Sequence, residues 1–308
     1  MNQLFPSWAW LCLAFLWLFS GLEAWAQVPA PAPAQSQPIA LTGATLHIGD
    51  GNVVENGIIA FDEGKITYAG TENGAIDLSS YEKIDASGKH IYPGLIQLNT
   101  TLGLEESSAV KASRDYDEVG ALTPNVRAIS AYNTDSEIIG TLRFNGILLA
   151  QATPQGGIMS GTSSVVQLDA WNWEDAAYRM DGGLHLNWPR RFYGPRWWLG
   201  ETERRPNKKY EEQVQSMKQL MKEAKAYSEV DSPEEENLKF EAMKGLFDGS
   251  RTLYLHTDKA KTIVSASRFA EEMGVEEIAV MGRARYSRSA DPPPPPALPR
   301  GCRCRPSL

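Results

Sequence analysis

The sequence predicts an α/β protein, in which an incomplete TIM-like (β/α) barrel is preceded by a small β-domain. Short alternating β-runs occupy residues 39–93, and strand and helix patterns then alternate over 94–282. This alternation favours a parallel barrel over a β-sandwich. The pattern stops abruptly at Arg283, so about five or six of the eight barrel units are expected, with unpaired strand edges on one side. The 308 residues, 42% of them hydrophobic, are enough to bury such a core.

The small β-domain is predicted from a hairpin. Residues 58–61 and 65–70 form two β-rich runs on either side of the acidic turn Asp62-Glu63-Gly64. Two such runs joined by a short Gly-containing turn are typical of antiparallel strands. The hairpin lies upstream of an apolar run at 95–98, which predicts the first barrel strand.

The remaining barrel elements follow from apolar runs and amphipathic patterns. Further strands are expected at 146–152, 163–168, 253–256 and 275–281. Helices are expected at 127–132, 136–144 and 259–273, together with two amphipathic helices between residues 207 and 247. Pro233, preceded by Ser and followed by acids, favours the start of the second of these two helices.

Both ends of the chain differ from its body. An apolar run from Trp8 to Leu18, followed by Ala24-Trp25-Ala26, predicts a cleaved export signal over 1–26 and hence a periplasmic protein. An uncleaved membrane anchor is the alternative. Residues 27–38 are typical of an exposed Pro/Ala linker. Residues 283–308 contain seven prolines and six arginines, and they indicate either a Pro/Arg-rich disordered tail or a frameshifted one.

Composition narrows the possible partners. The formal net charge is -8 and the pI is near 5.2, so no general basic surface is available for nucleic acid. The three cysteines, Cys12, Cys302 and Cys304, lie in the terminal segments, which excludes a disulfide framework in the body. We expect a small-molecule substrate or ligand, and membrane contact only through the signal segment.

The segment Tyr92-Pro93-Gly94-Leu95-Ile96 and the residues after it resemble the entry to the barrel of the amidohydrolase superfamily. Two longer segments, 131–136 and 161–173, are similar to an exported, imidazolonepropionase-like branch. The resemblance implies hydrolysis of carbon–nitrogen bonds other than peptide bonds by water bound to zinc or another divalent metal. Family members place a His-x-His metal pair at the end of the first barrel strand, whereas this chain has Asn99 and Thr101 there.

Of the four histidines, His256 matches a strand-end metal ligand of the family by position, and a locally bonded histidine is the alternative. No catalytic residue is assigned from the sequence. The Gly/Ser-rich stretch 153–164 predicts either a cradle for an anion or carbonyl group or a tight loop that needs glycine. The candidate pocket consists of Asn99, Thr101, Gly157, Ser160, Thr162 and His185.

Aromatic side chains concentrate between residues 171 and 198, with Arg190, Arg191 and Arg196 among them. Stacking on a sugar or aromatic ligand is one interpretation. Packing of a long loop on the barrel rim is the other. For the whole chain two functions remain open: a hydrolase with an altered site around His256, Asn99 and Thr101, and a non-catalytic periplasmic binding or scaffold protein on the same fold.

The number of matched ligands yields a prediction. A catalytic zinc usually has three protein ligands, and only His256 is matched here. We therefore expect the folded, purified protein to contain no stoichiometric zinc, as measured by elemental analysis. One tightly bound zinc per chain, lost in the His256→Ala variant, would contradict this expectation.

Overall fold

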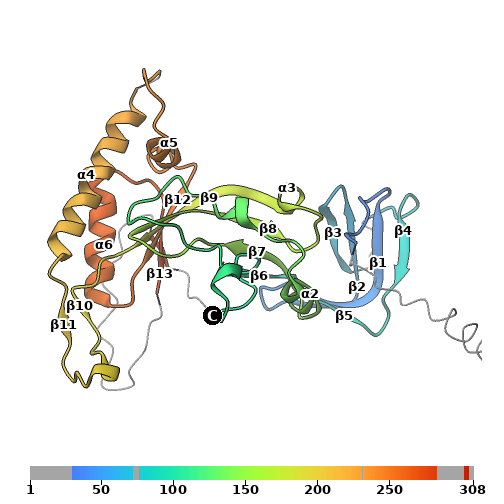
Figure 1. The fold of residues 1–308 in the computed structure, drawn as a ribbon. Helices are drawn as coiled ribbons and strands as arrows, with labels where there is room; N and C mark the ends of the chain where they lie inside the picture. The colour runs from blue at the N-terminus through green and yellow to red at the C-terminus, as the bar shows by residue number, and fades with distance from the viewer. Residues whose placement is uncertain (1–29, 72–75, 231, 283–301, 305–308) are drawn as a thin grey trace, which may run out of the picture. The chain divides into compact units, whose positions relative to one another are not determined.

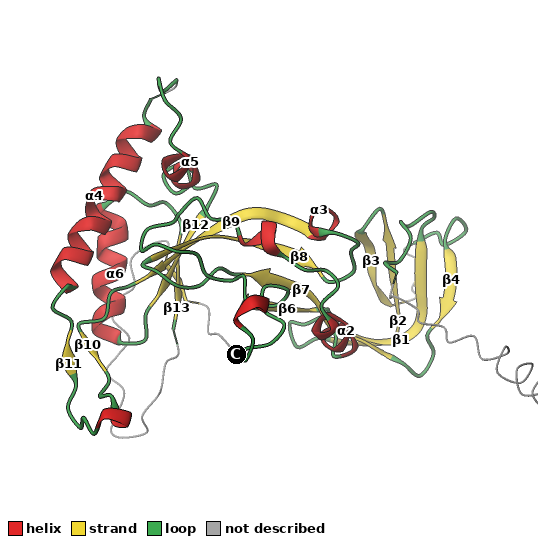
Figure 2. Ribbon diagram, viewed as in Figure 1, coloured by secondary structure: helices red, strands yellow, loops and turns green. Residues whose placement is uncertain are grey.

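The computed structural model describes residues 30–71, 76–230, 232–282 and 302–304, the last three by backbone alone. The chain separates into a short N-terminal unit, Met1–Ala32, and a main unit, Pro33–Leu308. The main unit contains two large sheets (Figures 1 and 2). The predicted export signal at 1–26 lies outside the described residues. Within the described ranges, no helix has the length and apolar character needed to cross a membrane.

Five strands form the small sheet, in the order β3-β2-β1-β4 with β5 beside β1. β2 and β3 are antiparallel, which confirms the predicted hairpin. The two central residues of its turn, Glu63 and Gly64, have φ of 46° and 72°. Positive φ at both positions is typical of a type I′ turn, whose twist matches that of the strands. The strands are β1 (Ile39–His47), β2 (Val53–Asp62), β3 (Lys65–Thr71), β4 (Glu82–Asp85) and β5 (His90–Ile91).

The second sheet is a curled, incomplete barrel with the order β14-β13-β12-β9-β8-β7-β6. Five of its strands form at the predicted apolar runs, whereas β9 forms at residues 177–187, where no strand was expected. Residues 302–304 of the Pro/Arg-rich segment add β14 beside β13. The rest of 283–308 lies outside the described residues. The strands are β6 (Leu95–Thr100), β7 (Ile147–Ala152), β8 (Met159–Gln167), β9 (Ala177–Asn187), β12 (Thr252–His256), β13 (Ile278–Met281) and β14 (Cys302–Cys304).

One strand corrects the expectation of a wholly parallel sheet. β8 runs antiparallel to both β7 and β9, while the other neighbouring pairs are parallel. The reason is the length of the connections. Only residues 153–158 join β7 to β8, and a parallel crossover needs about a dozen or more residues. The chain therefore turns back before it continues as β9, after the short helix α3 (Trp173–Ala176).

The helices agree with the sequence patterns in most places. α2 (Glu137–Phe144) and α6 (Ala260–Glu272) form where expected, but the segment expected at 127–132 is a short 3-10 helix, Ala128–Ala131. α4 (Tyr210–Ser228) and α5 (Leu238–Lys244) are the two predicted amphipathic helices. α5 starts later than Pro233 because Asn237 provides its N-cap, accepting from the Lys239 amide at 3.0 Å.

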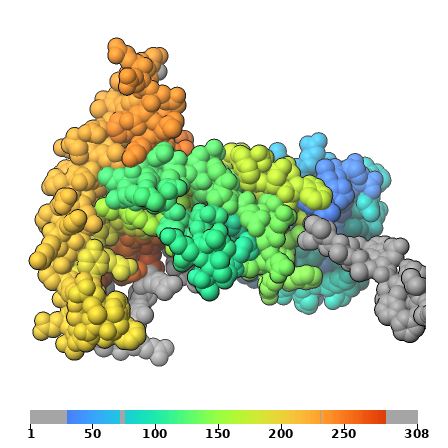
Figure 3. Space-filling view, in the orientation of Figure 1, coloured from blue at the N-terminus to red at the C-terminus, as the bar shows by residue number. Residues whose placement is uncertain are grey.

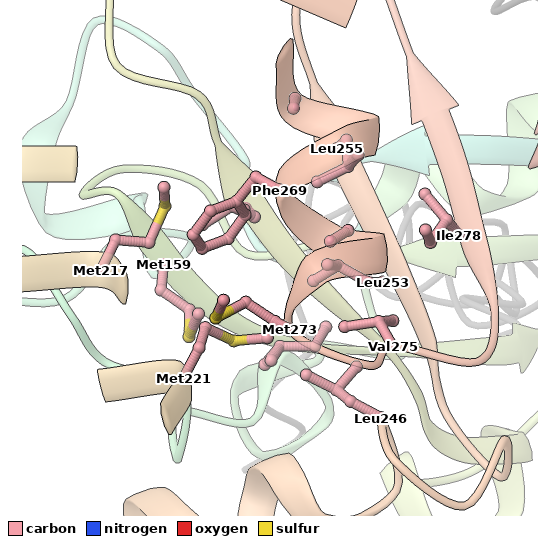
Figure 4. Close-up of a cluster of buried hydrophobic side chains, with 14 of the residues drawn as sticks. Met159, Met217, Met221, Leu246, Leu253, Leu255, Phe269, Met273, Val275 and Ile278 are labelled. Atoms are coloured by element: carbon pink, nitrogen blue, oxygen red, sulfur yellow. The ribbon is translucent and has the colours of Figure 1, made fainter. Parts of the chain in front are cut away.

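The main core lies between one face of β8, β9 and β12 and the three helices α4, α5 and α6 (Figure 4). α4 contributes Met217, Met221 and Ala224, which recur at helical spacing and are buried. Five methionines, from β8, α4, α5 and the residue after α6, lie in this core, where their unbranched side chains fill irregular space: Met159, Met217, Met221, Met243 and Met273. The core holds the helices against the strands that end at the candidate site.

Leu253 of β12 tests the importance of this core, because its side chain is fully buried there. We expect Leu253→Ala to lower the free energy of unfolding by about 2–5 kcal/mol, through lost transfer energy and the cavity left behind. Urea denaturation measures the change. Leu238→Ala is the matched control, since that leucine is 63% exposed. Equal effects in the two variants would contradict the proposed core.

Candidate functional site

A row of polar side chains crosses the face of the barrel sheet opposite the helices. In β9, Leu184 and Leu186 point into the main core, so His185 between them points to the other face of the sheet. Tyr254 of β12, the register partner of His185, stacks on its ring at 4.8 Å between centroids. His185 is fully buried, and His256 stands two residues further along β12.

These side chains form a continuous chain of hydrogen bonds. Gln151 Nε2 donates to Ser163 Oγ at 3.0 Å, and Ser163 Oγ lies 2.7 Å from His185 Nε2. His185 Nδ1 then lies 2.8 Å from His256 Nε2. The Gln151 amide is oriented by its other end, because its Oε1 accepts from the Asn99 backbone N–H at 3.3 Å. The row therefore links β6, β7, β8, β9 and β12.

The position of the protons along this row follows from the requirement that a buried hydroxyl be satisfied. Ser163 is only 1% exposed, and its oxygen already accepts from Gln151. Its own O–H finds an acceptor only if His185 Nε2 is unprotonated. Otherwise a buried donor is left without a partner, at a cost of about 1–3 kcal/mol. His185 thus carries its proton on Nδ1 and donates to His256 Nε2.

This tautomer fixes His256 as well. Since its Nε2 accepts, a neutral His256 carries its proton on Nδ1. Nδ1 forms no hydrogen bond with a described residue, so it is the ring nitrogen left for a ligand. Burial holds the pKa of His185 well below its usual value and lowers that of His256 to about 4, the latter despite the nearby Asp258. Both rings are therefore neutral at pH 7.

His256 opens onto a cavity of about 1110 Å³. The cavity lies where β6, β9, β12 and β13 end, and residues from all four strand ends line it. The carboxyl ends of parallel barrel strands are where active sites of barrel enzymes lie. Other lining residues come from the loop after β7, including Gly156 and Gly157, and from 188–194 after β9.

The structure brings some of the predicted pocket residues to this cavity and not others. Asn99, Gly157 and His256 line it. Asn99 has a φ of 51°, an uncommon conformation for a residue other than glycine. His185 lies one hydrogen bond behind the cavity wall, through His256.

Three further predicted residues are occupied elsewhere. Thr101 Oγ1 donates to Glu105 at 3.4 Å, and Ser160 Oγ donates to the Gly156 carbonyl at 2.7 Å. Thr162 Oγ1 bonds Asp181 at 2.9 Å, on the face of β8 away from Ser163. Ser160 still supports the cavity indirectly, because Asn187 Nδ2 donates to it at 2.8 Å and also to the Gly156 carbonyl. These bonds hold the glycine loop in place.

The other histidines form a separate pair in the small sheet. His47 Nε2 lies 3.0 Å from His90 Nδ1, and His47 stacks on Tyr92 at 4.1 Å between centroids. Neither of these histidines lines the cavity at the end of the barrel strands.

The aromatic residues between 171 and 198 lie in several different environments. Trp188 is buried and meets Phe269 edge-on, whereas Trp197 and Trp198 are 79% and 64% exposed. Trp197 and Trp198 belong to a small projection, the ribbon β10 (Phe192–Tyr193) and β11 (Arg205–Pro206) with the turn between them, seen at the surface in Figure 3. The aromatic residues of this stretch do not gather into one cluster.

The donor set does not fit the metal centre that the resemblance implies. Among the residues that the structure describes, no group of three or more His, Cys, Asp or Glu side chains is placed to hold a metal ion. His256 Nε2 is hydrogen-bonded to His185. His256 Nδ1 could coordinate a metal only if it carried no proton, and His185 Nε2 would then carry one and leave the Ser163 hydroxyl without an acceptor. Asn and Thr oxygens at 99 and 101 are weak ligands for zinc.

The curled sheet with helices on one face, together with the preceding small sheet, defines a barrel-type α/β protein. Its fold is similar to that of an amidohydrolase from Thermotoga maritima MSB8, with a TM-score of 0.67 at 20% identity. The similarity covers 79% of this chain and 64% of that one. It shows an incomplete TIM-like barrel preceded by a small β-domain.

Sequence relatives lead to the family. An imidazolonepropionase of Methylobacterium nodulans is 33% identical over 118 residues, 35% of this chain and 30% of that protein. A 5-methylthioadenosine/S-adenosylhomocysteine deaminase of Symbiobacterium thermophilum is 42% identical over 48 residues, 16% of this chain and 11% of that protein. No protein-family model matches the chain. The chain thus matches under a third of these relatives' length, and relatives and fold together support the amidohydrolase superfamily as its family.

The paired histidines generate a prediction about pH. Below pH 6.5 a histidine in the unfolded chain binds a proton, whereas folded His256, with its pKa lowered to about 4, does not. The unfolded state therefore gains protons, and the free energy of unfolding falls as the pH falls. Between pH 7 and pH 5 we expect His256 to account for a loss of about 2 kcal/mol, with His185 acting in the same direction.

Urea denaturation at several pH values measures this slope in the wild type and in His256→Asn, which cannot titrate there. The measurement stays above pH 5, because stability that depends on ionised carboxylates is lost at lower pH. Glu201 is one such carboxylate, since hydrogen bonds from Arg196 lower its pKa to about 2. The slope should be shallower in the variant. Identical slopes would contradict the buried neutral pair.

Proposed function

We propose that this chain is a hydrolase that cleaves a carbon–nitrogen bond, other than a peptide bond, in a small molecule held in the cavity. The observation that carries the proposal is the neutral His256 at the cavity wall, with its proton order set by Ser163 and His185. The names of the relatives, an imidazolonepropionase and a deaminase, support this reaction class. We derive no step through a metal, because the described side chains do not fit one.

His256 and Asp258 supply the chemistry in this proposal. The His256 Nδ1–H donates to the substrate carbonyl oxygen and stabilises the negative charge that develops there. Asp258 lines the same cavity, and its carboxylate takes a proton from the attacking water as the new C–O bond forms. The carbonyl then re-forms, the C–N bond breaks, and the proton passes from Asp258 to the leaving nitrogen. The products are a carboxylic acid and an amine.

A second function is favoured by a specific observation. Asn99 and Thr101 occupy the positions of the family's metal pair, and Thr101 is bonded to Glu105 rather than directed to a ligand. A protein on this fold that binds a ligand in the same cavity without turning it over agrees with that replacement. In either case we propose that the chain is exported, on the basis of its first 26 residues.

Substitution of His256 tests the hydrolase. Purified protein is incubated with a panel of linear and cyclic amides, and products are identified by mass spectrometry. For a substrate that is turned over, His256→Gln should lower kcat by about 10²- to 10³-fold, the usual cost of one lost oxyanion donor. His90→Gln, in the small sheet, is the matched control and should retain full activity.

The outcomes separate the two functions. Turnover that is unaffected by His256→Gln would remove that residue from the mechanism. Binding of a panel compound by folded protein, with no turnover of any compound, would overturn the hydrolase and leave the binding protein.

A further inference from the structure

The charge of the cavity is opposite to that of the chain. Among the described residues that line it, five are positively charged and one, Asp258, is negative, a formal charge of +4 since His256 is neutral. The whole chain has a formal net charge of -8. The basic residues lining the cavity are Arg190, Arg191, Arg204, Lys259 and Lys261. Clefts lined by charge of one sign raise the local concentration of ligands of the other sign.

Three of these basic residues come from two adjacent strand ends. Asn187 and His256 are register partners at the ends of β9 and β12, and the Trp188 amide donates to the His256 carbonyl at 3.1 Å. Arg190 follows β9 by three residues, and Lys259 follows β12 by three. Figure 1 shows β9 and β12 side by side where the chain leads into α6. The basic side chains therefore lie at the same end of the barrel as His256.

Three of the basic side chains have no polar partner within the part of the chain that the structure describes. Arg190, Lys259 and Lys261 form no side-chain ion pair or hydrogen bond with the residues that the structure describes. Arg191 differs, because its guanidinium lies over the Tyr210 ring at 4.4 Å from the centroid. Cationic side chains that line a cavity and have no carboxylate partner among the described residues are available for an anionic ligand.

The start of α6 adds to this excess of positive charge. Its N-cap is Lys259, which makes no side-chain capping bond, and the first turn contains no acidic residue. Helix N-termini carry partial positive charge and normally favour Asp or Glu nearby. Lysines at 259 and 261 oppose that preference. A bound anion between the two lysines would offset the repulsion between their charges and the positive end of the helix. Unfavourable local charge arrangements of this kind are expected at functional sites.

We infer that the cavity takes a small molecule bearing an oxyanion group, carboxylate or phosphate, held by Arg190, Lys259 and Lys261 at the ends of β9 and β12. The reactive C–N bond of the same molecule would then lie toward His256. The identity of this molecule as a substrate rests on the proposed function, but its binding does not. With about 1110 Å³, the cavity has room for such a molecule, since ligand sites usually measure roughly 300–1,000 Å³.

Equilibrium binding of probes that cannot be hydrolysed tests the inference. Glutarate, inorganic phosphate and the neutral analogue glutaramide are titrated into the full chain by calorimetry at low ionic strength. We expect one of the anions to bind at a single site at least tenfold more tightly than glutaramide. The better of glutarate and phosphate distinguishes a carboxylate from a phosphate ligand.

Variants with equal charge change locate the site. Lys259→Gln/Lys261→Gln should weaken anion binding at least tenfold, and Arg190→Gln should weaken it further. Lys65→Gln/Lys83→Gln, in the small sheet, removes the same charge and should leave binding within twofold of the wild type. An equal loss of anion affinity in both double variants would show an effect of net charge alone and would overturn the site. Equal binding of glutarate, phosphate and glutaramide would also overturn it.

The two proposals fail separately. Anion binding that depends on Lys259 and Lys261, without turnover of any compound in the panel, supports the site and overturns the hydrolase. Turnover of neutral amides that neither anion inhibits supports the hydrolase and overturns the anion site.

Discussion

The hydrogen bond between the Ser163 hydroxyl and His185 is the constraint on which the rest of the site depends. Burial of the hydroxyl determines which nitrogen of His185 carries the proton, and that assignment determines the proton on His256 one ring further. The Asn99 amide orients Gln151, which in turn donates to Ser163. The chemical character of the cavity wall is therefore set on β8, which is the one strand of the described barrel sheet that runs antiparallel to both of its neighbours.

Most of the fold could be predicted because it follows from local patterns. The turn at Glu63 and Gly64, the apolar run of β12 and the periodic stripe of α4 each specify an element within a short stretch of chain. The direction of β8 was missed, because an apolar run has the same appearance whether its strand is parallel or antiparallel. The short connection at 153–158 was the signal that could have corrected it.

The site was less predictable because its contacts are remote in sequence. His256 and Asn99 were identified by matching them to the positions of the family's strand-end metal ligands, and both line the cavity. Ser163 was predicted only as part of a strand and of the Gly/Ser-rich stretch, yet it bonds His185 from 22 residues away. Gln151 has no distinguishing motif. Arg190, Lys259 and Lys261 carry ordinary surface charges in the sequence, and only the adjacency of β9 and β12 gives them a common location.

The methionines of the main core have a consequence for the chemical durability of the protein. Oxidation turns the flexible thioether of methionine into a polar sulfoxide, which disrupts apolar packing. Met159, Met217, Met221 and Met243 are fully buried, so the folded chain shields their sulfur atoms from oxidants. Damage would then occur during transient opening of α4 or α5. Resistance to peroxide becomes a measure of how often these helices leave the sheet, and an oxidised chain could not close again around the same core.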